Sequence, residues 1–339
     1  MLAVWIGTGS IVGNAEQTYD SGMAALLLPT GTFFGMILLS LIATRARNVE
    51  ANTVPEIIHR RFGATARNLA MLSLVAAYMV IVSYQFNAGG AVLEVIVGDK
   101  AILTAQQATM IAAAFIIAYA ALAGLLSLAW MDLVTGSIIM LTMVIAFPIY
   151  WFKAGGWPGI ESAFIADQRA SHLSLWGVYT PTQLVNYILP VFLLVLGDAN
   201  QYQRIFASRS GKGARTAVTM MIFIAFAIEL LIIVCAWIAS SMTPDPENGK
   251  YILIYAARHY LALPLGCLFM VTVVAIIIST ASSFLHVPAT SVVNDLYLPY
   301  VNRGASQKHI IWVSRLFVVV FGVIAYFVTL MFSESTGFF

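Results

Sequence analysis

The sequence predicts an all-α protein that crosses a lipid bilayer several times. Of its 339 residues, 60% are hydrophobic and only 9% are charged, and the mean hydropathy is +0.89. Soluble domains carry roughly 25% charged residues, so a soluble fold of this composition would leave a large apolar surface in water. A bilayer accepts such a surface as the exterior of the protein. The apolar residues also form runs close to the length of about 20 residues that a spanning helix needs.

Nine apolar stretches are long enough to be membrane-spanning helices. They cover residues near 1–18, 23–44, 68–97, 106–123, 125–152, 184–203, 214–241, 263–293 and 310–332. Several are longer than a bilayer requires, which predicts helices that tilt or extend beyond the membrane.

The basic residues predict the side of the membrane on which each loop lies, because Lys and Arg concentrate in cytoplasmic loops. If the first span runs outward, 12 of the 17 Lys and Arg residues are cytoplasmic and five are extracellular. The cytoplasmic residues are Arg45, Arg47, Arg60, Arg61, Arg67, Arg204, Arg209, Lys212, Arg215, Arg303, Lys308 and Arg315. The extracellular residues are Lys100, Lys153, Arg169, Lys250 and Arg258. This excess favours the stated orientation over its inverse.

A long stretch at residues 153–182, rich in Gly, Pro and Trp, divides the chain and is predicted to be an extracellular loop. Five predicted spans lie before it in residues 1–152, and four lie after it in residues 183–339. Residues 52–62 predict a short amphipathic helix on the cytoplasmic side, with Pro55 near its first turn. The chain begins inside an apolar stretch without a basic lead, so we expect further residues upstream rather than a signal peptide.

Several other classes of function are disfavoured. The two cysteines, Cys235 and Cys267, lie in separate apolar runs and form neither a disulfide framework nor a zinc-binding spacing. The net charge of +2 is too small to indicate a nucleic-acid partner. The five histidines are scattered, without a metalloprotease motif or a Ser-His-Asp arrangement, so we expect the protein not to be an enzyme.

The first span contains three glycines within seven residues, Gly7, Gly9 and Gly13. Each glycine costs an α-helix about 1 kcal/mol relative to alanine, so this stretch predicts an interrupted helix. Many transporters use an interrupted membrane helix to present carbonyl oxygens to sodium and a helix N-terminus to substrate. The alternative is close packing of neighbouring helices through small residues.

The eighth span carries four hydroxyl side chains in five residues, from Ser279 to Ser283. Ser279, Ser282 and Ser283 are spaced i, i+3 and i+4, so they share one helix face. Hydroxyl and carbonyl oxygens are suitable ligands for a hard cation such as sodium. The alternative use of these hydroxyls is hydrogen bonding to the helix backbone and to neighbouring helices.

Two acidic residues lie within predicted spans, where a charge is costly and is a candidate for function. Asp132 lies about two turns into the fifth span, at a depth compatible with that of Ser282 in the eighth. We therefore predict that Asp132 faces Ser282 and Ser283, either around a cation or through structural hydrogen bonds. Glu229 lies in the middle of the seventh span without a charged neighbour, and both a structural role and an ion-pathway role are open. The run from Asp198 to Arg204 predicts a polar cytoplasmic helix end.

Taken together, stretches along nearly the whole chain resemble the sodium:solute symporter family. They are Thr53-Val54-Pro55-Glu56, Arg61-Phe62-Gly63, Ala123-Gly124-Leu125 with Trp130-Met131-Asp132, Gly197-Asp198-Ala199-Asn200-Gln201-Tyr202-Gln203-Arg204, Ser279-Thr280-Ala281-Ser282-Ser283 and Asn294-Asp295-Leu296-Tyr297. The chain departs from the family pattern at Ala123, where the family has Gly, and at Met131, where it has Thr.

The resemblance implies a LeuT-type fold, in which two inverted repeats of five helices hold ligand sites near the midplane of the membrane. Residues 1–152 are the first repeat and residues 183–339 the second, so we expect the tenth core helix to follow Phe339. The resemblance further implies a multi-pass protein of the plasma (inner) membrane. Such a protein takes up a small organic solute together with sodium by alternating access.

The resemblance also implies specific sites. Carbonyls of Ala3, Ile6 and Ile276 and hydroxyls of Ser279 and Thr280 correspond to the main sodium site. Asp132, Ser282 and Ser283 correspond to a second sodium site that some members have. Candidate substrate-binding residues are Trp5, Ser10, Tyr84, Gln85 and Asn87.

The residue before Ile6 bears on the class of substrate. Trp5 stands where proline-transporting members have Asp, and its surroundings look more like choline-transporting members, in which an aromatic ring could make a cation–π contact. The alternative function is a membrane sensor or signalling module, since the same fold occurs fused to kinase domains. A proton-coupled carrier would use a Lys or an acid in place of the sodium oxygens, and the hydroxyl cluster disfavours it.

Overall fold

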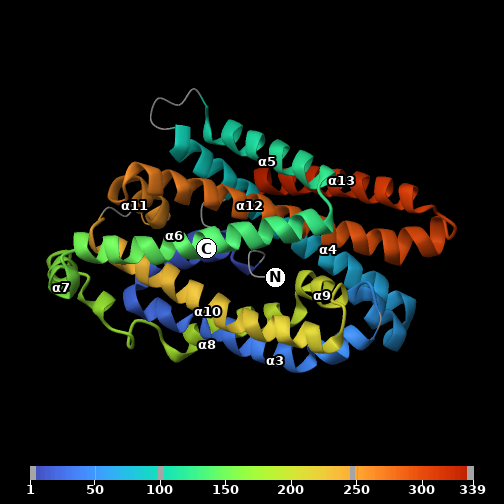
Figure 1. Cartoon of the computed structure of the whole chain (residues 1–339), viewed down its shortest axis with the longest axis horizontal. Helices are drawn as coiled ribbons and strands as arrows, with labels where there is room; N and C mark the ends of the chain where they lie inside the picture. The colour runs from blue at the N-terminus through green and yellow to red at the C-terminus, as the bar shows by residue number, and fades with distance from the viewer. Residues whose placement is uncertain (1–4, 50, 98–102, 245–248, 250, 334–339) are drawn as a thin grey trace.

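The computed structural model describes residues 5–49, 51–97, 103–244, 249 and 251–333. All regular secondary structure in these residues is helical (Figure 1). The α-helices are α2 (Asn14–Ser21), α3 (Thr30–Asn48), α4 (Val54–Val97), α5 (Ala105–Leu122), α6 (Leu125–Lys153), α7 (Gly156–Ala166), α8 (Pro181–Gly197), α9 (Ala199–Phe206), α10 (Gly211–Ser241), α11 (Ile252–Tyr260), α12 (Leu263–Val292) and α13 (Gln307–Ser333). Tighter or wider helical turns form η1 (Gly9–Gly13), η2 (Gly22–Leu27), η3 (Ala170–Leu173) and η5 (Val293–Val301).

Seven helices of the described chain are long and apolar enough to cross a bilayer, or up to eight if a bent pair counts as one span. The bent pair comprises Gly9–Leu27 and Thr30–Asn48, which meet at 51° and hold the first two predicted spans. These seven helices and the two members of the bent pair lie at the positions of the nine stretches predicted from the sequence. Because η1 and η2 interrupt the helix of the first stretch, this stretch meets the length criterion only together with α3.

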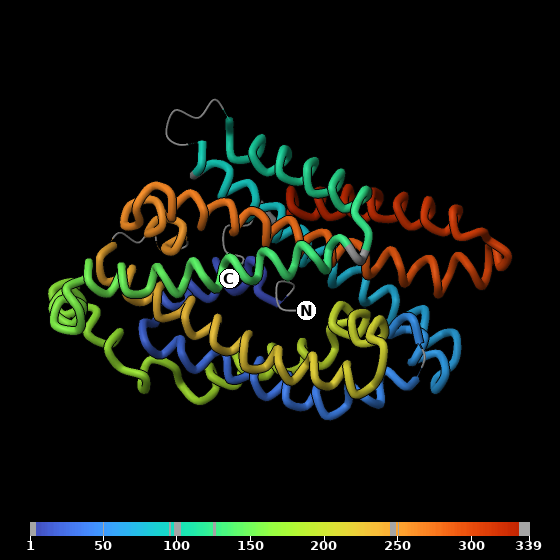
Figure 2. The backbone as a smooth tube through the Cα atoms, in the orientation of Figure 1, coloured from blue at the N-terminus to red at the C-terminus, as the bar shows by residue number. Residues whose placement is uncertain are grey.

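The long helices pack in two groups around a shared centre (Figures 1 and 2). In one group α3 packs against α8 and α10, and in the other α4 packs against α5, α12 and α13. α6 contacts both α10 and α12, so it connects the groups. The start of the chain lies at the centre, where α2 contacts α10 and buried Ile6 and Ile11 join the larger hydrophobic core.

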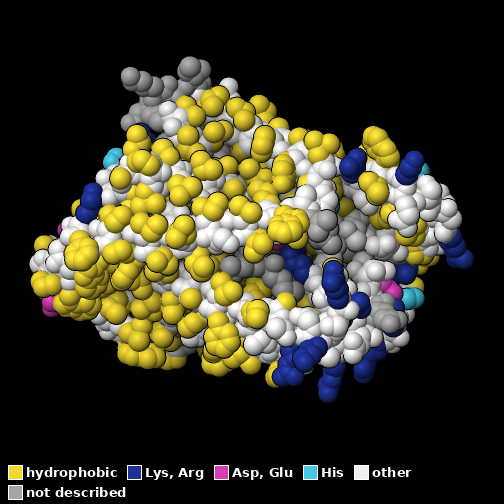
Figure 3. Space-filling model, viewed as in Figure 1, with side chains coloured by type: hydrophobic (Ala, Val, Ile, Leu, Met, Phe, Trp, Pro, Cys, Tyr) yellow, Lys and Arg dark blue, Asp and Glu magenta, His cyan; other side chains and the backbone are white. Residues whose placement is uncertain are grey.

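The exterior of the molecule matches a lipid environment. Large apolar side chains cover the body, whereas Lys and Arg gather at the right-hand end (Figure 3). Phe115, Leu141 and Phe223 are each more than half exposed, which would be unfavourable over so wide an area in water. Two predicted cytoplasmic loops meet at one end, because Arg47 Nε donates to the Ser208 carbonyl at 2.6 Å. The protein is a multi-pass membrane protein.

The short cytoplasmic helix predicted at residues 52–62 forms the beginning of α4. The Glu56 amide donates to Thr53 Oγ1 at 3.1 Å, which caps the helix start. Gly63 then takes a left-handed backbone conformation, with φ of 83°, that separates this helix from the spanning part of α4. Thr53 Oγ1 also lies 2.8 Å from Asp295 Oδ2, so two stretches that carry the family resemblance contact each other.

Candidate functional site: an interrupted helix, a hydroxyl cluster and a cavity

The first helix is irregular at the position that the glycines predict. Ile6 and Gly7 form a bend, and Gly9–Gly13 is a turn of π-helix rather than α-helix. Gly7 faces α12 closely, since a Cβ added to it would lie 3.1 Å from Thr280 Cγ2 and 3.4 Å from Thr280 Oγ1. The interrupted helix therefore lies directly against the hydroxyl cluster, and a larger side chain at Gly7 would force the two apart.

The hydroxyl cluster of α12 is fully enclosed in protein. Ser279, Thr280, Ser282 and Ser283 are each at most 2% exposed. A hard cation needs oxygen ligands shielded from competing water, and this segment supplies several on one helix. Ile6 and Ile276, whose carbonyls are predicted sodium ligands, are buried as well. Ala3, the remaining predicted ligand, lies outside the described residues.

Asp132 of α6 points inward and contacts the hydroxyl cluster. Its side chain is 3% exposed, and its Oδ1 accepts a hydrogen bond of 2.5 Å from Ser279 Oγ. Asp132 and Ser279 belong to different predicted sodium sites, so the structure joins the two sites through this bond. The sequence correctly placed Asp132 at the depth of the cluster.

Arg204 is the residue that the sequence reasoning misplaced. The positive-inside count treats it as a loop residue, but its side chain is only 10% exposed and pairs with Asp132 at 2.8 Å. The same guanidinium donates to Ser283 Oγ at 3.2 Å and to Asn200 Oδ1. Arg204 thus links the Asp132 carboxylate to one of the two serines with which pairing was predicted.

Ser282 has a different surrounding from its neighbours. Its Oγ is buried and has no hydrogen-bond partner within the described part of the chain. Buried hydroxyls are rarely left unpaired, so this oxygen is available to a ligand such as a cation or a water molecule. The residues of the predicted second sodium site therefore lie close together, between α6 and α12. The guanidinium of Arg204 already provides a positive charge beside Asp132 there.

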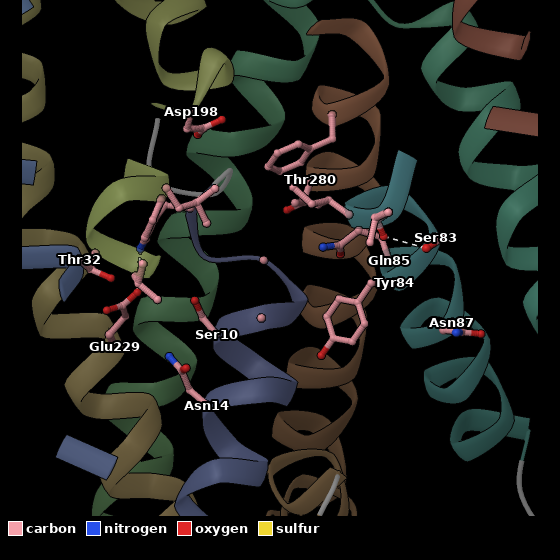
Figure 4. Close-up of a pocket in the computed structure, with 18 residues that line it drawn as sticks. Ser10, Asn14, Thr32, Ser83, Tyr84, Gln85, Asn87, Asp198, Glu229 and Thr280 are labelled. Atoms are coloured by element: carbon pink, nitrogen blue, oxygen red, sulfur yellow. Dashed lines mark hydrogen bonds between the residues drawn. The ribbon is translucent and has the colours of Figure 1, made fainter. Parts of the chain in front are cut away.

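A cavity of about 480 Å³ lies beside this cluster, between the two groups of helices (Figure 4). It is lined by all five predicted substrate-binding residues, Trp5, Ser10, Tyr84, Gln85 and Asn87. Thr280 of the hydroxyl cluster also lines it, together with the apolar side chains of Val80, Ile81, Val191, Leu194 and Phe284. Volumes of about 300–1,000 Å³ are usual for small-molecule sites, so the cavity fits a small organic solute.

Glu229 gains a partner that no local pattern could reveal. The Trp5 indole Nε1 donates to Glu229 Oε1 at 2.8 Å, across 224 residues of sequence. Both residues line the cavity. Figure 4 shows Glu229 near Thr32 and Asn14 on one wall, with Tyr84 and Gln85 on the opposite side. The sequence predicts that Glu229 is an isolated intramembrane acid, but its spacing does not predict a position at the cavity.

The prediction of a polar cytoplasmic helix end at residues 198–204 is corrected by the structure. Asp198 is 5% exposed and lines the cavity, and Asn200 and Gln201 are buried. Asp198 separates α8 from α9 and accepts hydrogen bonds from Tyr78 Oη at 2.6 Å and from the Asn200 amide at 3.0 Å. Polarity alone predicts exposure for this run, whereas in the structure it is buried, with Asp198 hydrogen-bonded and the Gln201 side-chain amide without a partner among the described residues.

Comparisons with known proteins agree with this architecture. A model described as "Sodium:solute symporter family" matches residues 1–339. The high affinity choline transporter 1 of Mus musculus is 25% identical, over 96% of this chain and 58% of the transporter. The sodium/proline symporter of Haemophilus influenzae is 23% identical, over 93% of this chain and 66% of the symporter.

A solved structure of a Na⁺-coupled sialic acid symporter, in a substrate-bound outward-open state, superposes with a TM-score of 0.81. It is 16% identical to this chain, and the match covers 99% of this chain and 73% of the other. This likeness confirms the predicted LeuT-type fold. The present chain spans 58% of the length of the mouse choline transporter.

Proposed function

Because this chain belongs to the sodium:solute symporter family, we propose that it takes up a small organic solute together with sodium. The sodium gradient across the plasma membrane drives the transport, and alternating access exposes the cavity first to one side and then to the other. The two halves, residues 1–152 and 183–339, are the inverted repeats, separated by the extracellular loop at 153–182. The coupling ion and the solute are the partners of this cycle.

The observation that carries this proposal is the shared position of Thr280. It belongs to the buried hydroxyl cluster, it contacts the interrupted helix at Gly7, and it lines the cavity. Sodium held by Ser279 and Thr280 hydroxyls and by carbonyls of Ala3, Ile6 and Ile276 would fix the interrupted helix against α12. Since that helix also contributes Trp5 and Ser10 to the cavity, ordering it favours binding of the solute. Linkage makes this effect reciprocal, so the solute strengthens sodium binding equally.

A second sodium ion would bind between Asp132, Ser282 and Ser283. The unpaired Ser282 oxygen and the buried Asp132 carboxylate support this site. Arg204 must release Asp132, at least in part, for a cation to gain the full charge of the carboxylate. The ratio of sodium to solute measured for Asp132→Asn tests the site, because loss of one coupled ion supports it and an unchanged ratio leaves Asp132 a structural role.

The main sodium site is tested by uptake into proteoliposomes that contain the full-length protein. Replacing Ser279 and Thr280 by Ala should raise the sodium concentration for half-maximal uptake at least about tenfold, which corresponds to about 1.4 kcal/mol. Ser306→Ala, on the exposed segment before α13, is a matched control that should leave this concentration unchanged. Sodium activation that is identical in the wild type and the double variant would contradict the assignment.

A further inference from the structure

The Glu229 carboxylate lies at the cavity with only part of its hydrogen-bonding capacity used. Trp5 donates to Oε1, whereas Oε2 is buried and has no hydrogen-bond partner among the described residues. A buried carboxylate without a cationic partner is costly, and a positive charge placed beside it would offset that cost. This inference rests on the proposed function and names the class of its substrate. We propose that Glu229 is the counter-ion of a positively charged nitrogen, so that the transported solute is a small organic cation.

The charges around the cavity point the same way. A second cavity of about 280 Å³ adjoins the first, and Glu229, Asn14 and Thr32 line both. Glu16 lines the second cavity and Asp198 the first, while neither cavity has a Lys, Arg or His among its described lining residues. A solute with a carboxylate or phosphate would meet three acidic side chains and no basic one among these lining residues. A cationic solute would meet acidic side chains in both cavities.

The other side chains favour an organic cation over a bare metal ion. A hard metal ion needs several oxygen ligands at short distance, and Oε1 of Glu229 is already occupied by the Trp5 indole. Aromatic faces attract alkylated ammonium groups, and Trp5, Tyr84 and Phe284 supply three rings to the cavity. Its remaining lining includes aliphatic residues that suit the carbon substituents of such a group.

The position of Glu229 gives it influence over the transport cycle. It belongs to α10, which packs against α3 and α2, whereas its partner Trp5 precedes the interrupted part of the first helix. A cation bound between them would contact both the interrupted helix and the neighbouring group of helices. Because Trp5 is one residue from the predicted sodium ligand Ile6, binding of the organic cation and binding of sodium affect the same segment.

The experiment measures sodium-driven uptake into proteoliposomes with the full-length protein and a defined set of probes. The cations are choline and ethanolamine, the zwitterion is proline and the neutral solute is glucose. We expect sodium-stimulated uptake of at least one cation and none of proline or glucose. Uptake of proline or glucose without uptake of either cation would overturn this inference while leaving the proposed function intact. No sodium-stimulated uptake of any of these probes would count against the proposed function as well.

Two variants and one inhibitor isolate the charge of Glu229. Glu229→Gln keeps an oxygen that accepts the Trp5 hydrogen bond but removes the charge, and it should raise the KM for the cation at least about tenfold. Glu161→Gln makes the same chemical change on the exposed part of α7 and should not alter KM. A KM of Glu229→Gln within twofold of the wild type would overturn the proposal.

The inhibitor keeps the test decisive if Glu229→Gln does not fold. 3,3-Dimethylbutan-1-ol has the shape of choline but carries carbon in place of the charged nitrogen. In the wild type it should inhibit cation uptake at least about tenfold more weakly than unlabelled choline. Equal inhibition by the two compounds would mean that charge is not recognised.

Discussion

The ion pair between Arg204 and Asp132 allows a quantitative test of the site. Its atoms are 2.8 Å apart, and its side chains are 10% and 3% exposed. Replacing Arg204 by Gln removes the charged partner but leaves the Asp132 carboxylate inside the protein. Breaking a buried pair in this way costs about 3–5 kcal/mol. Ser279 still donates to Asp132, so we expect a loss near the lower end, about 3 kcal/mol.

A double-mutant cycle separates this charge effect from lost packing. Asp132→Asn keeps an oxygen for Ser279 and removes the carboxylate that needs Arg204. The double variant Asp132→Asn/Arg204→Gln should therefore be more stable than the sum of the single effects predicts, by about 2 kcal/mol. The assay is equilibrium unfolding of the purified protein in mixed micelles, at low and at high sodium concentration.

Additive effects would refute this reasoning. If the two single losses sum to the loss of the double variant within about 0.5 kcal/mol, the two side chains are not energetically coupled. Unfolding measured at several sodium concentrations gives an independent result, since a sodium ion at the proposed second site would compete with Arg204 for Asp132. Added sodium should therefore stabilise Arg204→Gln more than it stabilises the wild type.

Three further predictions concern topology, packing and pH. Lys212→Cys, exposed at the start of α10, should resist an impermeant maleimide added to intact cells. Glu161→Cys, on the exposed face of α7, should react with it. The reverse pattern would overturn the predicted orientation. Gly7→Ala should weaken sodium activation of uptake several-fold, because the added Cβ would lie 3.1 Å from Thr280 Cγ2. Gly304→Ala adds a Cβ that meets nothing within 4 Å, so it should leave sodium activation unchanged. Equal effects of the two variants would contradict the contact between Gly7 and Thr280. Burial lowers the pKa of the His172 imidazole, which also faces Asp20 and Arg169. The unfolded chain therefore binds a proton at His172 more readily than the folded protein does. The stability contributed by neutral His172 should fall as the pH drops below about 6.5. The fall in melting temperature on acidification should be smaller in His172→Gln, and an identical fall would exclude His172 as its source.

Much of the fold could be predicted because it depends on properties of short segments. Hydropathy over one helix length determines whether a segment enters the bilayer, and the positions of Lys and Arg indicate its direction. The three glycines of the first span predicted the irregular helix found at Gly7 to Gly13, since backbone preference is local. The same reasoning located the hydroxyl cluster and the depth of Asp132. The LeuT-type arrangement itself came from a resemblance and not from any of these local signals.

The errors arose where the outcome depends on two segments at once. Polarity alone predicts that Arg204 is a loop charge and that residues 198–204 lie at the surface. Only the packing of α9 against α12, which brings Arg204 to Asp132 of α6, shows that these two residues pair. Hydropathy also does not register that η1 and η2 interrupt the first apolar run.

By itself, the sequence determined the membrane class, the interrupted helix and the chemical type of the candidate ion ligands, and it predicts an orientation that the labelling experiment tests. The tertiary structure decided that Ser279 rather than Ser282 donates to Asp132, and that Glu229 receives Trp5 beside a cavity. The physical reason is that spacing along a helix defines which residues share one face. The rotation and tilt of that helix against its neighbours define which residues of other helices this face contacts. Those two quantities are set by packing among helices far apart in sequence, such as the contact between Trp5 and Glu229 across 224 residues.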